Sequence, residues 1–245
     1  MEKHIKKTDN KKEVLIKGVN LKKTYIMGEV EINALDSVDF EIHKGELLVI
    51  LGPSGSGKST MLNIIGGMDS PTGGELYFED TPVHEMNKRR LTMYRRKNIG
   101  FIFQFYNLLP NLTALENVDI AREISESSLK SEDMLAKVGL SERKNHFPSQ
   151  LSGGEQQRVA IARALAKDPD VFLCDEPTGA LDSKSSKDVL RVLHNFCREF
   201  SKTVIIITHN NAIASMADRI MVLRDGRIID VIVNENPADI EDTEI

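Results

Sequence analysis

The sequence of 245 residues predicts an α/β fold with a parallel sheet. Short runs rich in β-branched residues alternate along the chain with segments of helical pattern. Two of these runs, Val171–Cys174 and Val204–Ile207, are apolar without a break, as is typical of parallel strands that are buried on both faces. The segment Lys184–Phe200 between them is long enough to be the helix that joins two parallel strands. Parallel β-structure is therefore expected at the centre of the fold.

The remaining elements follow from local patterns and turn residues. Strands are expected at Val38–Ile42, Glu46–Leu51, Glu75–Glu79 and Ile99–Phe103, and helices from GPSGSGKST to about Ile65 and at Ala114–Ala121, Ser131–Val138 and Gln156–Ala166. Gly66 and Gly67 end the first helix, and Asp69–Gly74 is rich in turn residues. The three later helices predict a helical insert within the α/β core. The first dozen residues and the tail after Pro237 are expected to fray.

Composition and hydropathy exclude several classes of protein. With 40% hydrophobic and 28% charged residues, the chain has the balance of a globular protein and not of a disordered or membrane-embedded one. No apolar stretch approaches the ~18 residues of a membrane-spanning helix, and the basic N-terminal segment lacks the apolar core of a secretory signal. We therefore expect the protein to stay in the cytoplasm. The net charge of −5 argues against nucleic acid as a partner. Cys174 and Cys197 lack the spacing of a zinc site or a disulfide framework and are expected in the core.

Charge is distributed unevenly along the chain. The run KRRLTMYRRK, Lys88–Lys97, holds six basic residues, whereas the tail from Asn234 carries five acidic residues and no lysine or arginine. Two interpretations of the basic run stay open: a solvated helix face, or a surface that contacts anionic headgroups or a partner.

The stretch GPSGSGKS, Gly52–Ser59, matches the phosphate-loop pattern G-x-x-x-x-G-K-[ST] between a predicted strand and a predicted helix, which is the context that this pattern requires. Its glycines let backbone N–H groups curl around phosphate oxygens, and the helix N-terminus adds partial positive charge. Lys58 supplies a point charge for the β- and γ-phosphates, and Ser59 a hydroxyl for Mg²⁺. The predicted phosphate-binding residues are Gly52, Pro53, Ser54, Gly55, Ser56, Gly57, Lys58, Ser59 and Thr60.

Polar residues end three other predicted strands. Asp175 and Glu176 follow the apolar run of VFLCDE at the strand end where α/β sheets bind ligands. Because successive strand side chains point to opposite sides, we assign the first to Mg²⁺, through water, and the second to general-base or water-positioning work. Gln104 follows the strand Ile99–Phe103 and His209 follows VIIIT, so both could reach the same edge. The histidine could be structural or could lie near the γ-phosphate as a neutral imidazole.

Taken in order and spacing, these motifs resemble those of the ABC ATPases over nearly the whole chain, from about Val14 to Val233. LSGGEQQR (Leu151–Arg158) is similar to the signature motif, GPSGSGKST to Walker A, VFLCDE to Walker B, Gln104 to the Q-loop, Ala180–Asp182 to the D-loop, His209 to the switch histidine and Tyr25 to the aromatic residue that stacks on adenine. The resemblance implies a P-loop NTPase (RecA-like) core, an antiparallel β subdomain and a helical subdomain in a single domain, residues 1–245. Its core would span about 12–103 and 168–233, and its helical subdomain about 104–167.

The resemblance also implies a site for ATP and Mg²⁺. Its catalytic residues would be Glu176, His209 and Gln104, and its metal site would involve Ser59, Gln104 and Asp175. A helix N-terminus that bears SGG is an anion site in its own right, yet the chain has one phosphate loop, so two half-sites in one chain suggest that the complete site forms between chains. The family dimerises head to tail, which implies that Ser152, Gly153, Gly154 and Asp182 of one copy serve the nucleotide bound to the other.

A finer similarity is to the group of MacB-type exporters and LolD-type lipoprotein-releasing ATPases. The stretches YIMGEVEINALDSVDFEIHKGE and IGFIFQFYNLLPNLTALENV carry it. Glu155 stands where many cassettes have glutamine, but Ser152 and Gly154 are intact, so activity is expected. The span between Asn117 and Leu151 is short, which implies a trimmed helical subdomain.

The stretch FYNLLPNL, Phe105–Leu112, places many apolar residues around a predicted loop. These residues could pack the helical insert, or they could form a groove for a helix of a membrane permease. The expected function is an ATPase subunit on the cytoplasmic face of the membrane that drives a MacB- or FtsX-like permease docked near Gln104–Leu112, for export or force transmission. A regulatory cassette of a cell-division or antimicrobial-peptide-sensing complex is the alternative. A DNA-repair or translation cassette would carry a long coiled coil or a second cassette, and the sequence has neither.

Overall fold

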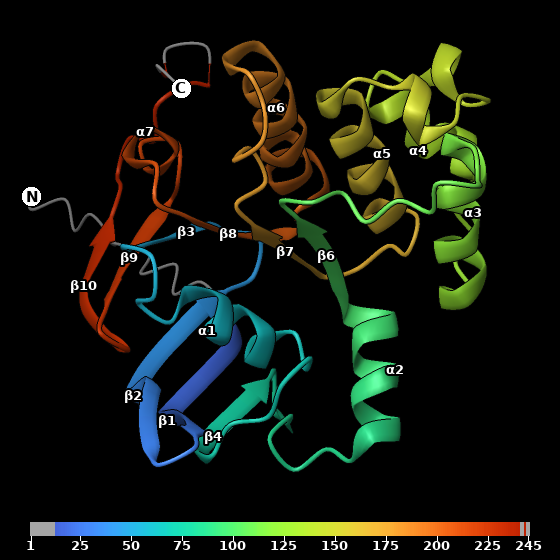
Figure 1. Cartoon of the computed structure of the whole chain (residues 1–245). Coiled ribbons are helices and arrows are strands. Elements are labelled where there is room, and N and C mark those ends of the chain that lie inside the picture. Colours follow the sequence, from blue (N-terminus) through green and yellow to red (C-terminus); the bar gives the residue numbers. More distant parts are fainter. Residues whose placement is uncertain (1–12, 241–242, 244–245) are drawn as a thin grey trace, which may run out of the picture.

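The computed structural model describes residues 13–240 and residue 243, and two sheets form its framework (Figure 1). The first sheet is antiparallel, in the order β2-β1-β4-β5, and consists of β1 (Val14–Met27), β2 (Val30–His43), β4 (Gly73–Phe78) and β5 (Thr81–Pro82). The second, in the order β10-β9-β3-β8-β7-β6, consists of β3 (Leu47–Leu51), β6 (Ile99–Phe103), β7 (Val171–Asp175), β8 (Thr203–Thr208), β9 (Arg219–Arg224) and β10 (Arg227–Val233). Its strands pair in parallel except β10, which is antiparallel to β9.

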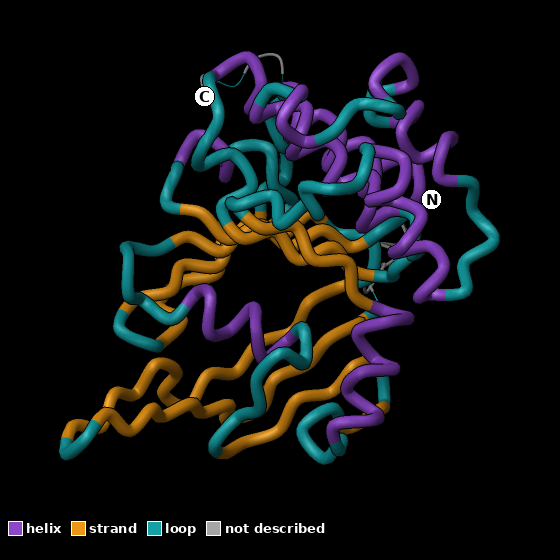
Figure 2. Tube along the Cα trace, turned by 45° about the vertical axis from the view of Figure 1, so that its right-hand side comes forward, coloured by secondary structure: helices purple, strands orange, loops and turns teal. Residues whose placement is uncertain are grey.

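Helices cover the parallel sheet on both faces, as the apolar strands predict. Helix α1 (Lys58–Ile65) lies between the two sheets, while α3 (Ala114–Ser125), α4 (Ser131–Lys137), α5 (Gly153–Leu165) and α6 (Ser183–Phe200) lie beyond the other face (Figures 1 and 2). Two more α-helices are α2 (Lys88–Asn98), before β6, and the short α7 (Asn211–Ala214), after β8. The predicted α/β fold is therefore confirmed.

Strand β3 shows how one sheet serves two cores. Residues 47–50 have no accessible surface. Leu48 and Ile50 pack with α1 and the antiparallel sheet, and Leu47 and Val49 pack with α5 and α6, because successive side chains point to opposite faces. The strand is thus fixed on both sides, and the loop that follows it starts from a rigid position.

Capping residues explain where the helices of the insert begin. Thr113 caps α3 and Ser152 caps α5, each by accepting a hydrogen bond from a glutamate N–H three residues later, while that glutamate side chain bonds back. Helix α5 accordingly starts at Gly153, three residues before its predicted start at Gln156. Helix α3 continues to Ser125, four residues beyond the predicted end.

Strand β1 and the β9–β10 hairpin, near the two ends of the chain, were not predicted, and helix α2 was expected only in one of the two interpretations of the basic run. The β9–β10 hairpin turns at Asp225 and Gly226, both of which have positive φ (49° and 73°), and an Asp-Gly pair between apolar runs is a known signal for this turn. Helix α2 starts at Lys88 and is capped by Asn87, whose side chain accepts a hydrogen bond from the N–H of Arg90. Strand β1, which pairs with both β2 and β4, was also not predicted.

Residues 238–240 of the C-terminal tail contradict the prediction that it frays after Pro237, and residues 241, 242, 244 and 245 lie outside the described part of the chain. The N–H of Ala238 donates to the carbonyl of Ser215, and Ile240 is 4% exposed within the core next to α6. Ile240 anchors this part of the tail in the core. The prediction missed this contact because the acidic composition of the segment gives no sign of it. The first dozen residues, also expected to fray, lie outside the described residues. Within the described part of the chain, no helix is both long and apolar enough to cross a membrane.

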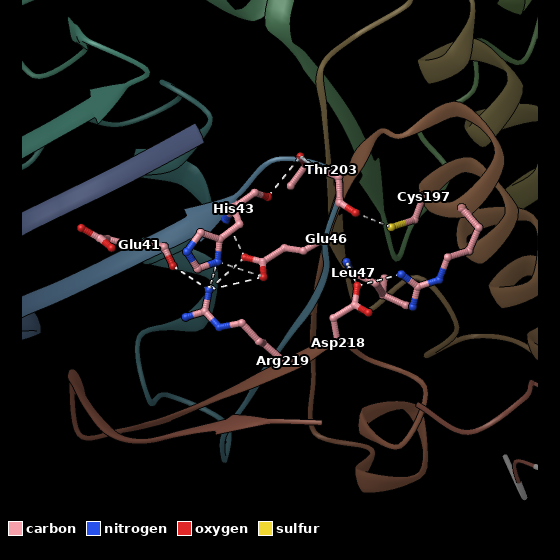
Figure 3. Close-up of polar contacts among 10 residues, drawn as sticks. Glu41, His43, Glu46, Leu47, Cys197, Thr203, Asp218 and Arg219 are labelled. Carbon is pink, nitrogen blue, oxygen red and sulfur yellow. Dashed lines mark hydrogen bonds and ion pairs between the residues drawn. The ribbon is translucent and has the colours of Figure 1, made fainter. Parts of the chain in front are cut away.

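A buried ion pair joins the two sheets at the edge where β3 starts (Figure 3). The carboxylate of Glu46 is fully buried and accepts hydrogen bonds from Arg219 Nη1 at 3.1 Å and from the N–H of His43 at 2.7 Å. Removing one partner of such a pair typically costs about 3–5 kcal/mol, because the other charge stays buried. The pair therefore holds β2, β3 and β9 in fixed relation, at the edge opposite the phosphate loop.

Candidate nucleotide-binding site

A cavity of about 1,100 Å³ opens at the edge of the parallel sheet where β3, β6, β7 and β8 end. Because these strands are parallel, the residues that follow them meet at one edge. The predicted site residues that line this cavity are Ser54, Gly55, Gly57, Lys58, Ser59, Thr60, Gln104, Asp175, Glu176 and His209. The structure thus brings together four segments that lie far apart in the sequence.

Glycine is required at several positions of the phosphate loop. Gly57 has a φ of 102° at the start of α1, and a Cβ there would lie 2.2 Å from the carbonyl oxygen of Ala34. A Cβ on Gly52 would lie 2.2 Å from the carbonyl oxygen of Leu223 in β9. No side chain caps α1, so its first N–H groups remain available to an anion. Gly52, Pro53 and Ser56 shape the loop but do not line the cavity.

Lys58 is held by the loop that precedes it. Its side-chain Nζ donates to the carbonyl oxygens of Gly52 at 2.8 Å and Pro53 at 2.9 Å, and the residue is 8% exposed. A phosphate would compete with these carbonyls for the same ammonium group. The lysine is therefore already positioned at the mouth of the loop.

Asp175 faces the phosphate loop from the end of β7. Burial raises the pKa of its carboxyl group, and a hydrogen bond from Ser59 partly offsets the effect. The nearby Glu176 raises the pKa further, whereas Lys58 lowers it. A hydroxyl and a carboxylate side by side are oxygen ligands of the kind that Mg²⁺ accepts with phosphates and water, so the two residues fit the predicted metal site. Among the described residues, no group of three or more His, Cys, Asp or Glu side chains gathers so that it could hold a metal ion.

Glu176 departs from the strand geometry that the sequence predicted. Strand β7 ends at Asp175, and Glu176 has a φ of 46°, so a left-handed turn and not strand alternation separates the two carboxylates. The carboxylate of Glu176 accepts hydrogen bonds from Thr208 Oγ1 at 3.0 Å and from the N–H of His209 at 3.1 Å. Its side chain is 18% exposed. The two carboxylates are thus separated by a backbone turn, and the difference between their roles stays a prediction.

Gln104 directly follows β6 and lies against the turn after Glu176. A Cβ on Gly179 would lie 3.0 Å from Gln104 Nε2, so the glycine allows this close approach. The segment after Gln104 is held from two helices: Arg163 of α5 donates to the carbonyls of Tyr106 and Asn107, and Asn117 of α3 donates to those of Leu109 and Leu112. Gln104 therefore links the cavity to a braced loop.

The apolar side chains of this loop divide between two environments. Leu108 packs against the core next to the helices, whereas Phe105 is 73% exposed and Leu109 is 48% exposed. Packing of the helical insert thus accounts for one of these residues. The exposed pair remains available to a partner.

Gln157 is a residue at this site that sequence reasoning missed. It is fully buried on α5, and its Nε2 donates to the carbonyl oxygens of Phe103 at 3.2 Å and Pro177 at 2.9 Å. These carbonyls belong to the residue before Gln104 and the residue after Glu176. The signal was available, because Gln157, Ala160, Ile161 and Ala164 share the buried face of one helix at intervals of three and four residues.

Tyr25 lies beside α1 and does not line the cavity. Its hydroxyl donates to Asp69 Oδ2 at 2.8 Å, and the Lys23 ammonium lies 4.9 Å from the centre of its ring. Burial and the bond to Asp69 raise the pKa of the phenol, while a hydrogen bond with Thr60 lowers it. The ring is 37% exposed, and its hydrogen bond with Thr60 places it next to the phosphate loop. Both observations are compatible with a contact to adenine, which stays a prediction.

The predicted signature and D-loop residues lie outside the cavity of their own chain. None of Ser152, Gly153, Gly154 and Asp182 lines it. Ser152 caps α5, and Asp182 caps α6 by accepting from the N–H of Ser185 at 3.0 Å. A Cβ on Gly154 would lie 2.7 Å from Ser185, so the starts of α5 and α6 approach closely. Ser152 and Asp182 are exposed there.

A phosphate loop on α1, facing carboxylates at the ends of a parallel sheet, defines a P-loop nucleotide-binding protein. The family model for ABC transporters matches residues 35–179. MJ0796, an ABC transporter ATP-binding protein of Methanocaldococcus jannaschii, is 48% identical over 223 residues, which cover 87% of this chain and 95% of the relative. Its solved dimer, in a post-hydrolysis state bound to ADP and Pi, matches with a TM-score of 0.83 at 44% identity over 91% of this chain and 100% of that one.

Two further relatives belong to named transport systems. The macrolide export ATP-binding/permease protein MacB of Hyphomonas neptunium is 45% identical over 229 residues, 91% of this chain and 35% of the relative. The lipoprotein-releasing system ATP-binding protein LolD 2 of Chlorobaculum tepidum is 41% identical over 226 residues, 88% of this chain and 92% of the relative. The chain belongs to the ABC transporter family. It is an ATP-binding subunit of this family that hydrolyses ATP, so the predicted family and activity are confirmed.

Proposed function

We propose that this subunit binds ATP with Mg²⁺ between two copies of the chain and uses the cycle of dimer formation and hydrolysis to drive a MacB/FtsX-like permease. The observation that carries the proposal is the convergence of Lys58, Asp175, Glu176 and His209 in one cavity, with the exposed starts of α5 and α6 outside it. The proposed domain is the whole chain, with its core at about 12–103 and 168–233 and its helical part at about 104–167.

Within one copy, the phosphate loop binds and orients the triphosphate. Lys58 exchanges its bonds to the loop carbonyls for bonds to phosphate oxygens, and the N–H groups at the start of α1 point to the same anion. Ser59 and Asp175, joined by Gln104, are the residues that would hold Mg²⁺. When bound, the metal would supply positive charge to the phosphates.

Glu176 then acts on the attacking water. Bonds from Thr208 and the N–H of His209 orient its carboxylate, which accepts a proton from the water as the water attacks the γ-phosphate. The imidazole of His209 also contacts the carboxylate, with Nδ1 2.8 Å from Oε1, the oxygen that accepts from the N–H of the same residue. We assign Glu176 as the base, and Gln104 and His209 as its neighbours at the γ-phosphate.

The second copy completes the site in this proposal. The start of α5 consists of the exposed cap Ser152, the partly exposed Gly153 and the buried Gly154, and the start of a helix favours an anion. The dimer of MJ0796 with ADP and Pi supports a two-fold arrangement in which these residues and Asp182 of one copy reach the nucleotide on Lys58 of the other. Formation of the dimer would then depend on ATP, and hydrolysis would release it.

The permease part of the proposal rests on the loop after Gln104. Phe105 and Leu109 are exposed, while Arg163 and Asn117 brace the backbone on either side. An apolar patch on a braced loop suits a helix that docks in a groove. The similarity to MacB and LolD 2 supports a permease of that group and a location on the cytoplasmic face of the membrane.

The substitution Glu176→Gln tests the catalytic assignment. It keeps the shape of the side chain but removes its ability to accept a proton. We expect ATP binding to persist, turnover to fall about a hundredfold or more, and an ATP-bound dimer to accumulate in size-exclusion chromatography. Turnover near that of the wild type would show that another group serves as the base. Glu142→Gln, an exposed glutamate between α4 and α5, is the matched control.

A further inference from the structure

A second cavity, of about 550 Å³, lies between helix α2 and the end of strand β4. It shares no lining residue with the nucleotide cavity. Three cationic side chains line it, Arg89, Arg90 and Lys97, all from α2. The basic run that the sequence singled out therefore forms one wall of a cavity and is more than a solvated helix face.

The three cations have no partner of opposite charge within the described residues. None of their side chains takes part in an ion pair or a hydrogen bond there, and Glu79 is the carboxylate that lines the same cavity. Their neighbours on α2 are engaged: Arg95 Nη1 donates to the carbonyl of Gly67 at 2.6 Å, and Arg96 lies 4.0 Å from Glu126. Positive charge is thus left available at this cavity, in a chain whose net charge is −5.

Apolar side chains form the rest of the cavity wall. Phe78 and Tyr94 are almost fully buried and pack edge to face with ring centroids 5.4 Å apart, and the Tyr94 hydroxyl donates to the carbonyl of Ile65 at 2.8 Å. Met93, on the same helix as the cations, is 40% exposed. A ligand that fits this cavity has an anionic group for the three cations and, next to it, an apolar part for the apolar side chains.

Helix α2 connects the cavity to α3 and to β6. Helix α2 contacts α3, and Arg96 of α2 pairs with Glu126 at the end of α3. Helix α2 also leads directly into β6 and so to the loop after Gln104, as Figure 1 shows. The cationic cavity therefore lies at the start of β6, and the loop that carries the exposed Phe105 and Leu109 follows the other end of this strand.

We propose that this cavity binds the headgroup of an anionic phospholipid at a membrane surface. Arg89, Arg90 and Lys97 contact the phosphate, and Met93 lies against the glycerol and the first methylene groups of the lipid. Because the whole chain is acidic, attraction to an anionic membrane has to arise locally, and these side chains supply it. The binding needs neither nucleotide nor permease, so it can fail or succeed independently of the proposed function.

Vesicle flotation with the full-length chain tests the proposal. Vesicles of phosphatidylcholine with a third of phosphatidylglycerol are compared with phosphatidylcholine alone, at low salt and at about 0.5 M salt. We expect binding to the anionic vesicles only, and loss of binding at high salt. The triple variant Arg89→Gln, Arg90→Gln, Lys97→Gln should bind about a hundredfold more weakly, from roughly fivefold for each charge.

The control carries the same change in net charge at exposed positions on other elements: Lys22→Gln, Lys130→Gln, Arg224→Gln. It should bind as the wild type does, and both triple variants should keep ATP turnover, which shows that they are folded. Equal loss in the control would overturn the local site, as would equal binding to both vesicle types. Inorganic phosphate or glycerol phosphate at millimolar concentration should compete only weakly with the vesicles. If either anion displaces the vesicles fully and the Met93→Ser variant still binds vesicles as the wild type does, the cavity is a site for free phosphate and the lipid proposal is refuted.

Discussion

Glu176 and His209 are hydrogen-bonded neighbours although 33 residues separate them, with Nδ1 of the imidazole 2.8 Å from Oε1 of the carboxylate. The contact follows from the sheet, because Asp175 and Ile207 are partners in register on β7 and β8. An ionised carboxylate only accepts hydrogen bonds, so the imidazole directs its Nδ1 proton towards Glu176. The N–H of His209 and the hydroxyl of Thr208 donate to the same carboxylate, so the candidate base is oriented from its neighbouring strand.

Removal of the imidazole should therefore lower catalysis more than binding. For His209→Ala we expect turnover to fall by roughly a factor of ten to a hundred with little change in nucleotide affinity, because the main-chain and Thr208 bonds to Glu176 persist. Steady-state phosphate release and equilibrium binding of a fluorescent ATP analogue separate the two effects. His194→Ala on α6 is the control and should leave both quantities unchanged. A parallel loss of affinity would place His209 in binding and not in the orientation of Glu176.

Ser152 should matter to a second copy of the chain more than to its own. In Ser152→Arg, the added side chain lies at the exposed start of α5, outside the nucleotide cavity. We expect the monomer to bind ATP as before and the ATP-dependent dimer to disappear, which size-exclusion chromatography with light scattering measures in a Glu176→Gln background. Ser149→Arg, three residues earlier and also exposed, is the matched control. If the dimer persists with Ser152→Arg, the signature residues do not reach across the interface.

The stability of the same variant needs a separate measurement, because Ser152 also caps α5. Loss of a cap costs about 0.5–2 kcal/mol of unfolding free energy. Ser152→Ala removes the cap without adding bulk. It should lower the denaturation midpoint as Ser152→Arg does but weaken the dimer much less, because it adds no bulk at the interface, which distinguishes a weakened helix from a blocked interface.

Asp175 should make the nucleotide-free protein less stable at neutral pH. Its pKa is raised in the folded state, chiefly by burial, so the folded state binds the proton more tightly than the unfolded state does. The ionised carboxylate lowers the free energy of unfolding. This loss is absent below the ordinary carboxyl pKa of about 4, grows as pH rises through the raised pKa of the folded state and is constant above it. Asp175→Asn should accordingly raise the melting temperature at pH 7, with a gap that closes as pH falls. Stabilisation by Mg²⁺-ATP should be lost in this variant, and a melting temperature below that of the wild type at pH 7 would contradict the assignment.

The parallel sheet and its site were predictable because their signals are local. Val171–Cys174 and Val204–Ile207 are apolar runs, and polar residues end each strand at the edge where ligands bind. The positive φ of Glu176 was not predictable, since a glutamate carries no preference for it and the bonds from Thr208 and His209 compensate for the strain.

Sequence reasoning also failed where long-range contacts decide. The partner of the Tyr25 hydroxyl is Asp69, 44 residues away in the segment between α1 and β4. The anchor of the tail is Ile240, one apolar residue in an acidic stretch. No local sequence pattern predicts either contact. The Asp225-Gly226 pair, in contrast, is a local signal for a hairpin turn and was overlooked.

Gln157 tests how helix α5 acts on the nucleotide site of its own chain. Its two hydrogen bonds join the carbonyls of Phe103 and Pro177, the neighbours of Gln104 and Glu176, so α5 holds both segments in place. The isosteric Gln157→Met removes the side-chain donor from both carbonyls, and a buried polar group left without a partner costs about 1–3 kcal/mol. Gln157→Glu adds repulsion, because an acceptor then faces two acceptors.

A positioning role predicts that catalysis and binding respond differently to these variants. We expect turnover to fall about tenfold in Gln157→Met and further in Gln157→Glu, while nucleotide affinity, set by the phosphate loop on α1, changes little, as expected when only transition-state interactions are lost. Gln156→Met, at the next position on α5 with its amide on the carbonyl of Leu151, is the control and should keep turnover. Urea denaturation reports the accompanying loss of stability. If turnover recovers when the Gln157 variants are measured at a temperature lowered to match the folded fraction of the wild type, the residue stabilises the fold without orienting Gln104 and Glu176.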